Sequence, residues 1–185
     1  SHIGLARALA RDPQMRERRR AIITAPASVR SVGEAVMAAD RLLETAKAQA
    51  DAQVSERNAR EKAELMRQLG MDEGESATKA SRTMIRQLEE DQKRRSKRAL
   101  TDAIDRALID LLAIYRDVLM VQVGGDGELI NTDLADLVHE IAQDSTPRQT
   151  LARVDHIETA RKRLVSNGNP LLVLEDMAIS LRPQA

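Results

Sequence analysis

Two short basic runs are the residues of this chain best suited to bind a ligand. They are "RERRRA" at 16–21 and "KRRSKR" at 93–98. Clustered cationic side chains neutralise phosphates, so the second run predicts phosphate contacts. The candidate contacts are Arg94, Arg95, Lys97 and Arg98. The run also follows the acidic residues 89–91 and would face Asp51 and Glu56 in a helical hairpin, so a solvated, internally ion-paired surface is the competing interpretation.

No arrangement of side chains predicts an active site or a metal site. The glycine-rich "GGDG" at 124–127 lacks the strand and the Lys-Ser/Thr of a P-loop, and it predicts a turn that ends a helix. The histidines His2, His139 and His156 are far apart, and one Asp136-x-x-His139 pair does not reproduce a di-iron bundle. No serine lies in a G-x-S-x-G elbow. We therefore expect no catalytic residue, no metal ligand and no cofactor in this chain.

Composition excludes several classes of protein. The chain has 185 residues, of which 42% are hydrophobic and 1% aromatic, so its core must use aliphatic side chains, which favour helices. Lys plus Arg and Asp plus Glu both number 29, so no net charge attracts the chain to DNA or a membrane. Cysteine is absent, which excludes disulfides and thiolate zinc sites. No apolar run approaches the roughly 20 residues of a membrane span, and we expect a cytoplasmic protein.

Capping signals and helical spacing predict an all-α fold. The dipeptide Asp12-Pro13 predicts the start of a helix that ends at Pro26. Ser31 and Glu34 form an S-x-x-E capping box at the start of a longer helix. No segment alternates with a period of two residues, so we expect no strand.

The middle of the sequence predicts a long antiparallel helical hairpin over 32–123, with its turn near 70–75. Apolar residues fade into alanines and charges along 32–69, return at its end, and recur in mirror order afterwards. A helix over 32–69 would extend about 57 Å, so part of the hairpin should project from a compact domain. A break near Arg57 or Arg95 is the alternative. The apolar tip of the hairpin comprises Leu65, Met66, Leu69, Met84 and Ile85.

Three shorter helices are expected after the hairpin. The first covers 133–143, with Asn131 or Thr132 as its cap. The dipeptide Thr146-Pro147 begins the second, because a capping residue followed by proline favours a helix start. The last begins at Pro170, after a left-handed turn at "NGN". Its buried face is predicted to comprise Leu171, Leu172, Leu174, Met177, Ala178 and Leu181.

Four stretches of the sequence, taken in order, resemble one family. They are "HIGLARALARDPQMRERR", "LLAIYRDVLMVQVG", "LIN" with the short helix after it, and "VDHIETARKRLVSNGNPLLVLEDMAISL". They resemble the end of a small lid domain, a collar helix with a Tyr-Arg-Asp core, the next connection, and a closing helix pair preceded by Asn-x-Asn-Pro. Over most of its length the chain is similar to the C-terminal region of delta-prime subunits of bacterial, actinobacterial-type DNA polymerase III clamp loaders.

The resemblance implies a non-catalytic role in assembly. In this family the C-terminal helical domains of five subunits pack into a collar, which supports ATP-driven loading of the sliding clamp during DNA replication. The implied direct partners are the gamma/tau and delta subunits. The sliding clamp and primed DNA would contact the chain only indirectly, through the full assembly. That assembly is the DNA polymerase III holoenzyme, a nucleotidyltransferase complex. The resemblance places the subunit interface at Tyr115, Arg116, Leu171, Leu174, Met177 and Leu181.

The resemblance also implies that Arg7 lies at the position of a sensor arginine that reaches ATP phosphates in nucleotide-binding relatives, with a lid-surface arginine as the alternative. Residues 1–20 are then the remnant of the lid domain of a longer chain, and 21–185 form a collar-type oligomerisation domain that includes the hairpin. The alternative hypothesis is a free-standing helical-hairpin adaptor that binds another protein through its apolar tip. Neither hypothesis involves a membrane.

Overall fold

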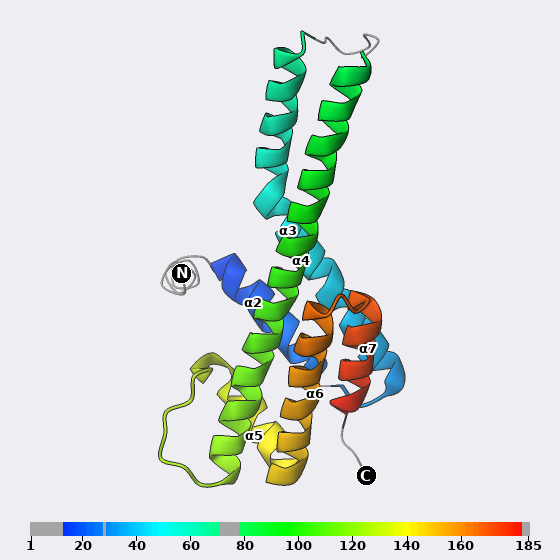
Figure 1. Ribbon diagram of the computed structural model, residues 1–185. Helices are drawn as coiled ribbons and strands as arrows, with labels where there is room; N and C mark the ends of the chain where they lie inside the picture. The colour runs from blue at the N-terminus through cyan, green and yellow to red at the C-terminus, as the bar shows by residue number, and fades with distance from the viewer. Residues whose placement is uncertain (1–12, 28, 71–77, 183–185) are drawn as a thin grey trace. The chain divides into compact units, whose positions relative to one another are not determined.

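The computed structural model describes residues 13–27, 29–70 and 78–182 (Figure 1). No strand occurs in these ranges, which agrees with the predicted all-α fold. The elements are α2 (Pro13–Ala27), α3 (Val32–Gln68), α4 (Lys79–Gln122), the 3₁₀ turn η1 (Thr132–Leu134), α5 (Ala135–Gln143), α6 (Pro147–Val165) and α7 (Pro170–Ser180).

The chain divides into two compact units. The hairpin unit is Ala46–Ala103, and the bundle unit contains the described residues up to Thr45 together with those from Ile104 onward. Helices α3 and α4 run through this division without a break, so the alternative of an interruption near Arg57 or Arg95 is wrong. The division into a lid remnant and a collar domain, and the projection of the hairpin, stay predictions.

Side-chain caps fix the starts of three helices as the sequence predicts. At α3 the Ser31 hydroxyl accepts from the Glu34 amide at 3.2 Å, and the Glu34 carboxylate accepts from the Ser31 amide at the same distance. Thr146 and Gln149 form an equivalent capping box at α6. The Asn169 side chain accepts from the Leu171 amide at 3.0 Å, with proline as the first residue of α7. Each cap satisfies amides that have no partner within the helix.

The predicted helix-ending turns also form. After α4, Gly124 has φ +64°, and the amide of Gly125 donates to the carbonyl of Met120 at 3.0 Å. After α6, Asn167 has φ 62°, and the Gly168 amide donates to the Arg163 carbonyl at 2.8 Å. These are Schellman motifs, which satisfy the last carbonyls of a helix. The "GGDG" segment is therefore a helix end, as predicted.

The sequence predicts that α2 ends at Pro26, and this prediction is wrong by one residue. The helix continues to Ala27, with Pro26 inside its last turn. A proline removes only its own amide hydrogen bond and restricts the residue before it, so the chain can complete a turn that has already formed.

The two units have different cores. In the hairpin unit, small residues let α3 and α4 approach closely: Ala50, Val54 and Ala99 form a cluster against Leu100. The bundle unit is packed by larger aliphatic side chains around Tyr115. Its fully buried members include Ile23, Ile104, Leu108, Leu111, Ile114, Val118, Val138, Ile157 and Leu174.

Helix α7 buries most of its predicted face, with one error. Leu174, Met177, Ala178 and Leu181 are buried and Leu171 is half-buried. Leu172 is 63% exposed, however, and the neighbouring Val173 is buried in its place. The reason is helical geometry: Val173 lies one turn before Met177 and shares its face, whereas Leu172 points away from that face.

Candidate functional site

The basic run at 93–98 lies on α4 in the hairpin unit, and two of its arginines are engaged in ion pairs. Arg95 donates to both carboxylate oxygens of Glu61 at 2.8 and 3.1 Å, and to Asn58 Oδ1 at 2.7 Å. Arg94 pairs with Asp91 on its own helix. This pattern favours the interpretation of an internally paired surface, and the phosphate contacts at Arg94, Arg95, Lys97 and Arg98 stay a prediction.

The partners across the hairpin differ from those expected. The helices are offset so that Arg95 lies opposite Asn58 and Glu61, rather than opposite Asp51 and Glu56. Glu56 instead pairs with Arg60 on its own helix. Exposed pairs of this kind contribute only about 0.3–0.5 kcal/mol each, so the alanine core and the Arg95 contacts must fix the register.

Glu61 is the electrostatic centre of the hairpin unit. Its carboxylate accepts from Arg95 across the hairpin and from Arg57 Nε at 2.8 Å on its own helix. Hydrogen bonds from Arg95 and then Arg57 outweigh desolvation and lower the pKa of Glu61 to about 2. The carboxylate therefore stays charged across the neutral and mildly acidic range.

The apolar tip of the hairpin is only partly covered. Leu65, Met66, Leu69 and Ile85 are half-buried, and Met84 is 50% exposed. Thr78 caps the start of α4, where its hydroxyl lies 2.8 Å from that of Ser81. The tip thus offers a little apolar surface beside the polar sides of the hairpin.

A buried carboxylate organises the bundle unit. Asp117 is 0% exposed and accepts hydrogen bonds from the Ile130 amide at 3.0 Å and the Asn131 amide at 2.8 Å. The Asn131 side chain donates to it at 2.9 Å, and Arg116 donates at 2.8 Å. Burial alone would raise the pKa of Asp117, but these hydrogen bonds outweigh it and lower that pKa.

This network connects two stretches that the sequence presents as separate motifs. Asp117 ends the Tyr-Arg-Asp core of α4, and Asn131 ends "LIN". Asn131 also accepts from Arg19 of α2 at 2.7 Å, and Arg19 forms an ion pair with Asp110 at 3.1 Å. Asn131 is the cap position of the 3₁₀ turn η1 that leads into α5, but its side chain makes no capping bond and binds Asp117 instead. The start of α5 itself lies later than expected, at Ala135.

The pairing of Asp117 with Asn131 was not predicted from the sequence. A signal was available, because Asp117 lies three residues after buried Ile114 and next to buried Val118, where a charge interrupts the apolar face of α4. Its partners could not be read in the same way, since they lie in an irregular connection whose path no periodicity describes.

The predicted interface residues fall into two groups. Tyr115, Leu174, Met177 and Leu181 are buried inside the chain, whereas Arg116 is partly exposed and donates to the carbonyl of Glu128 at 3.1 Å. The phenol oxygen of Tyr115 has no hydrogen-bond partner among the described residues, and burial raises its pKa to about 12. Which of these residues meet another chain of the assembly stays a prediction.

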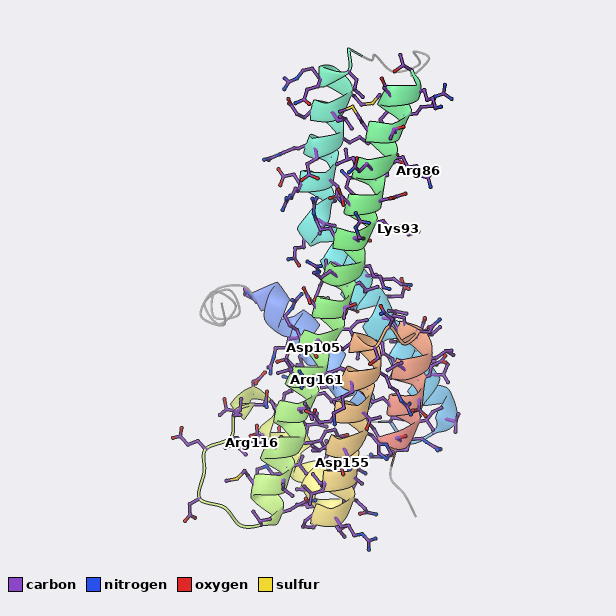
Figure 2. The ribbon with its side chains drawn as sticks, in the orientation of Figure 1. Arg86, Lys93, Asp105, Arg116, Asp155 and Arg161 are labelled. Carbon is purple, nitrogen blue, oxygen red and sulfur yellow. The ribbon has the colours of Figure 1, made fainter. Side chains whose placement is uncertain are left out.

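Helix α6 is attached to α4 by a bidentate ion pair. Arg161 donates to Asp105 at 2.7 and 3.3 Å, and Figure 2 shows the two residues on neighbouring helices. Near the turn between α6 and α7, two apolar side chains face outward: Val165 is 76% exposed and Leu172 is 63% exposed. An ion pair thus fixes α6 against α4, and apolar surface stays exposed at the turn between α6 and α7.

Other chemistry is absent from the described part of the chain. Within residues 13–27, 29–70 and 78–182, no three His, Cys, Asp or Glu side chains lie close enough to hold a metal ion. His139 and His156 are both exposed. Among the described helices, none is long and apolar enough to cross a membrane. Arg7 and His2 lie outside the described residues.

Comparisons with known proteins agree with these features. The model of the family described as DNA polymerase III, delta subunit, C terminal, matches residues 75–182. DNA polymerase III subunit delta' of Bacillus subtilis (strain 168) is 36% identical over 72 residues, which are 39% of this chain and 22% of that protein. The chain thus matches about a fifth of the length of this relative. No solved structure matches significantly.

The family match contains all of α4 to α7, and with them the Asp117 network and the closing helix pair. Because it covers more than half of the chain, the chain belongs to the family formed by the C-terminal regions of DNA polymerase III delta subunits, as its sequence motifs indicate.

Proposed function

We propose that this chain is a non-catalytic assembly region of the DNA polymerase III clamp loader. It packs with the gamma/tau and delta subunits in the cytoplasm into a collar that supports ATP-driven loading of the sliding clamp. The observation that carries this proposal is the family match over residues 75–182. The 36% identity to a delta' subunit favours the delta-prime position in the assembly.

The structure suggests how such a region presents a surface to its neighbours. Leu174, Met177 and Leu181 are buried in the chain's own core and hold α7 in place. Val165 and Leu172 are exposed at the turn beside it, where apolar side chains gain most from being covered by another protein chain. We therefore propose that Val165 and Leu172 contact a neighbouring loader protein, in addition to the predicted Arg116 and Leu171.

Association with partner subunits tests the proposal directly. Size-exclusion chromatography with light scattering is performed on this chain, alone and mixed with the C-terminal regions of gamma/tau and delta from the same organism. We expect a mixed complex, and we expect Leu172→Asp to weaken it while the helical content stays unchanged. If the chain forms no complex with either partner at micromolar concentration, the assembly role is refuted.

The exposure of Met84 supports a second candidate, an adaptor that binds through the hairpin tip. Replacing residues 48–97 with a short Gly-Ser turn separates the two functions. The collar function predicts retained folding and retained binding to the other loader subunits, because the bundle unit has its own core. The adaptor function predicts that binding is lost.

Two finer roles follow from the proposed assembly. If Arg94, Arg95, Lys97 and Arg98 contact DNA phosphates, the logarithm of affinity should fall with that of salt concentration, with a slope near −0.9 per phosphate. An affinity that does not change with salt concentration would refute this role. If Arg7 contributes to a composite ATP site, Arg7→Ala in the full-length protein should weaken nucleotide binding or clamp loading, and no change in either would remove that role.

A further inference from the structure

Arg153 of α6 is a buried cation that has no counter-ion among the described residues. It is 6% exposed, and among the described residues it makes no ion pair and no hydrogen bond. Its guanidinium carbon lies 5.9 Å from the centre of the Tyr115 ring, and this cation–π contact is the polar support that the described residues give it. Buried charges in proteins are normally paired, and an aromatic face replaces only part of the lost hydration.

The side chain of Arg153 lines a surface hollow of about 260 Å³. The other lining residues are Gln149, Ala152, His156, Ser180 and Arg182. The described lining of the hollow contains no acidic side chain, and its two arginines make it a cationic site. Arg182 uses its Nε to donate to the Ile179 carbonyl at 2.9 Å, and its terminal nitrogens donate to none of the described residues.

The polar groups of the hollow other than the cations are already used locally. The Ser180 hydroxyl donates to the Asp176 carbonyl at 2.9 Å, and Gln149 belongs to the capping box of α6. Among the described contacts, neither of these groups accepts a hydrogen bond from Arg153. A guanidinium has five donors and no acceptor, so a ligand of Arg153 must supply an acceptor, and an anion satisfies it best.

We propose that this hollow binds a carboxylate of a partner polypeptide, from either an acidic side chain or a chain terminus. The planar fork of Arg153 matches the two oxygens of a carboxylate, and the volume admits one side chain rather than an extended polymer. Nucleic acid is disfavoured, because Asp155 is exposed on the same helix as Arg153 and would repel a polyanionic backbone. Arg153 and His156 on α6 would then act together with Arg182 beyond α7.

This inference does not depend on the proposed function, since it concerns one hollow within this chain. Its test uses the isotope-labelled chain and follows the Arg153 side-chain Nε–H signal by NMR during addition of N-acetyl-glutamate amide. We expect a saturable shift with a dissociation constant on the order of 10 mM, as befits one charge-assisted contact. N-acetyl-glutamine amide, which has the same shape without the charge, should produce no saturable shift.

Two variants and one competing anion complete the test. Arg153→Lys should weaken N-acetyl-glutamate amide binding about tenfold, a difference of about 1.4 kcal/mol, because an ammonium cannot form the bidentate contact. Arg148→Lys, on the same helix but outside the hollow, should leave binding unchanged. Equal shifts with the glutamine compound, or no saturation with either, would overturn the proposal. Tighter binding of inorganic phosphate than of the carboxylate would also overturn it, in favour of a phosphorylated ligand.

Discussion

Replacing Asp117 tests the reasoning about the bundle unit most severely. Its carboxylate is fully buried and accepts four hydrogen bonds, of which two come from Asn131, itself 1% exposed. Asp117→Ala would leave both Asn131 donors without an acceptor. Each buried unsatisfied group costs about 1–3 kcal/mol, so we expect the free energy of unfolding to fall by about 3–5 kcal/mol.

Asp117→Asn separates the hydrogen-bond geometry from side-chain volume. The amide keeps the shape of the carboxylate, but its NH₂ group would replace one accepting oxygen and face other donors. We expect a loss of about 2–4 kcal/mol, close to that of the alanine variant, because charge and acceptor count rather than packing are at stake. A small loss for asparagine with a large one for alanine would show that packing dominates instead.

Urea denaturation followed by far-UV circular dichroism measures these differences. Asp102→Asn is the matched control, since Asp102 is exposed on the same helix and a surface change there should stay within about 0.5 kcal/mol. If both Asp117 variants unfolded within about 0.5 kcal/mol of the parent chain, the network would not stabilise the fold, and its link between α4 and the "LIN" connection would need another explanation.

Three further outcomes follow from other contacts. Glu61→Gln should lower stability at neutral pH, and this difference from the parent should vanish as the pH falls from about 4.5 toward about 2, because the folded-state pKa of Glu61 is depressed. Urea denaturation midpoints measured across this pH range check the prediction, and a difference that does not depend on pH would contradict it. Gly168→Ala should cost about 1–3 kcal/mol in urea denaturation, since a Cβ there would lie 2.8 Å from the Arg163 carbonyl oxygen, whereas Gly33→Ala should not destabilise. Leu174→Ala should cost about 2–5 kcal/mol and Leu172→Ala less than about 0.5 by the same method, with equal losses refuting the assignment of faces on α7.

The sequence was most informative where the chemistry is local. The capping box at Ser31, the start at Thr146 and the turn after α6 each depend on a few neighbouring residues, so side-chain type and spacing were enough to predict them. The boundary of α2 was missed by one residue because proline restricts the residue before it without forbidding one more turn position.

Features that depend on tertiary contacts could not be predicted in the same way. The offset between α3 and α4 arises from how alanines pack and from the reach of Arg95, which periodicity does not encode. Asn131 seemed a helix cap because asparagine favours that position, but a buried carboxylate far along the chain competes successfully for its side chain. The burial of Arg153 was not predicted, because arginine is normally a surface residue even where its position in a helix falls on the apolar face.

The burial of Tyr115 gives this molecule a built-in spectroscopic reporter. It is the only aromatic residue in the chain, it is 0% exposed, and it belongs to the bundle unit alone. Intrinsic ultraviolet fluorescence therefore follows the loss of that core, whereas the helical dichroism sums over both units. Superimposable transitions from the two signals would mean that the alanine-packed pair at Ala46–Ala103 melts together with its neighbour; separate ones would identify it as an independent cooperative element.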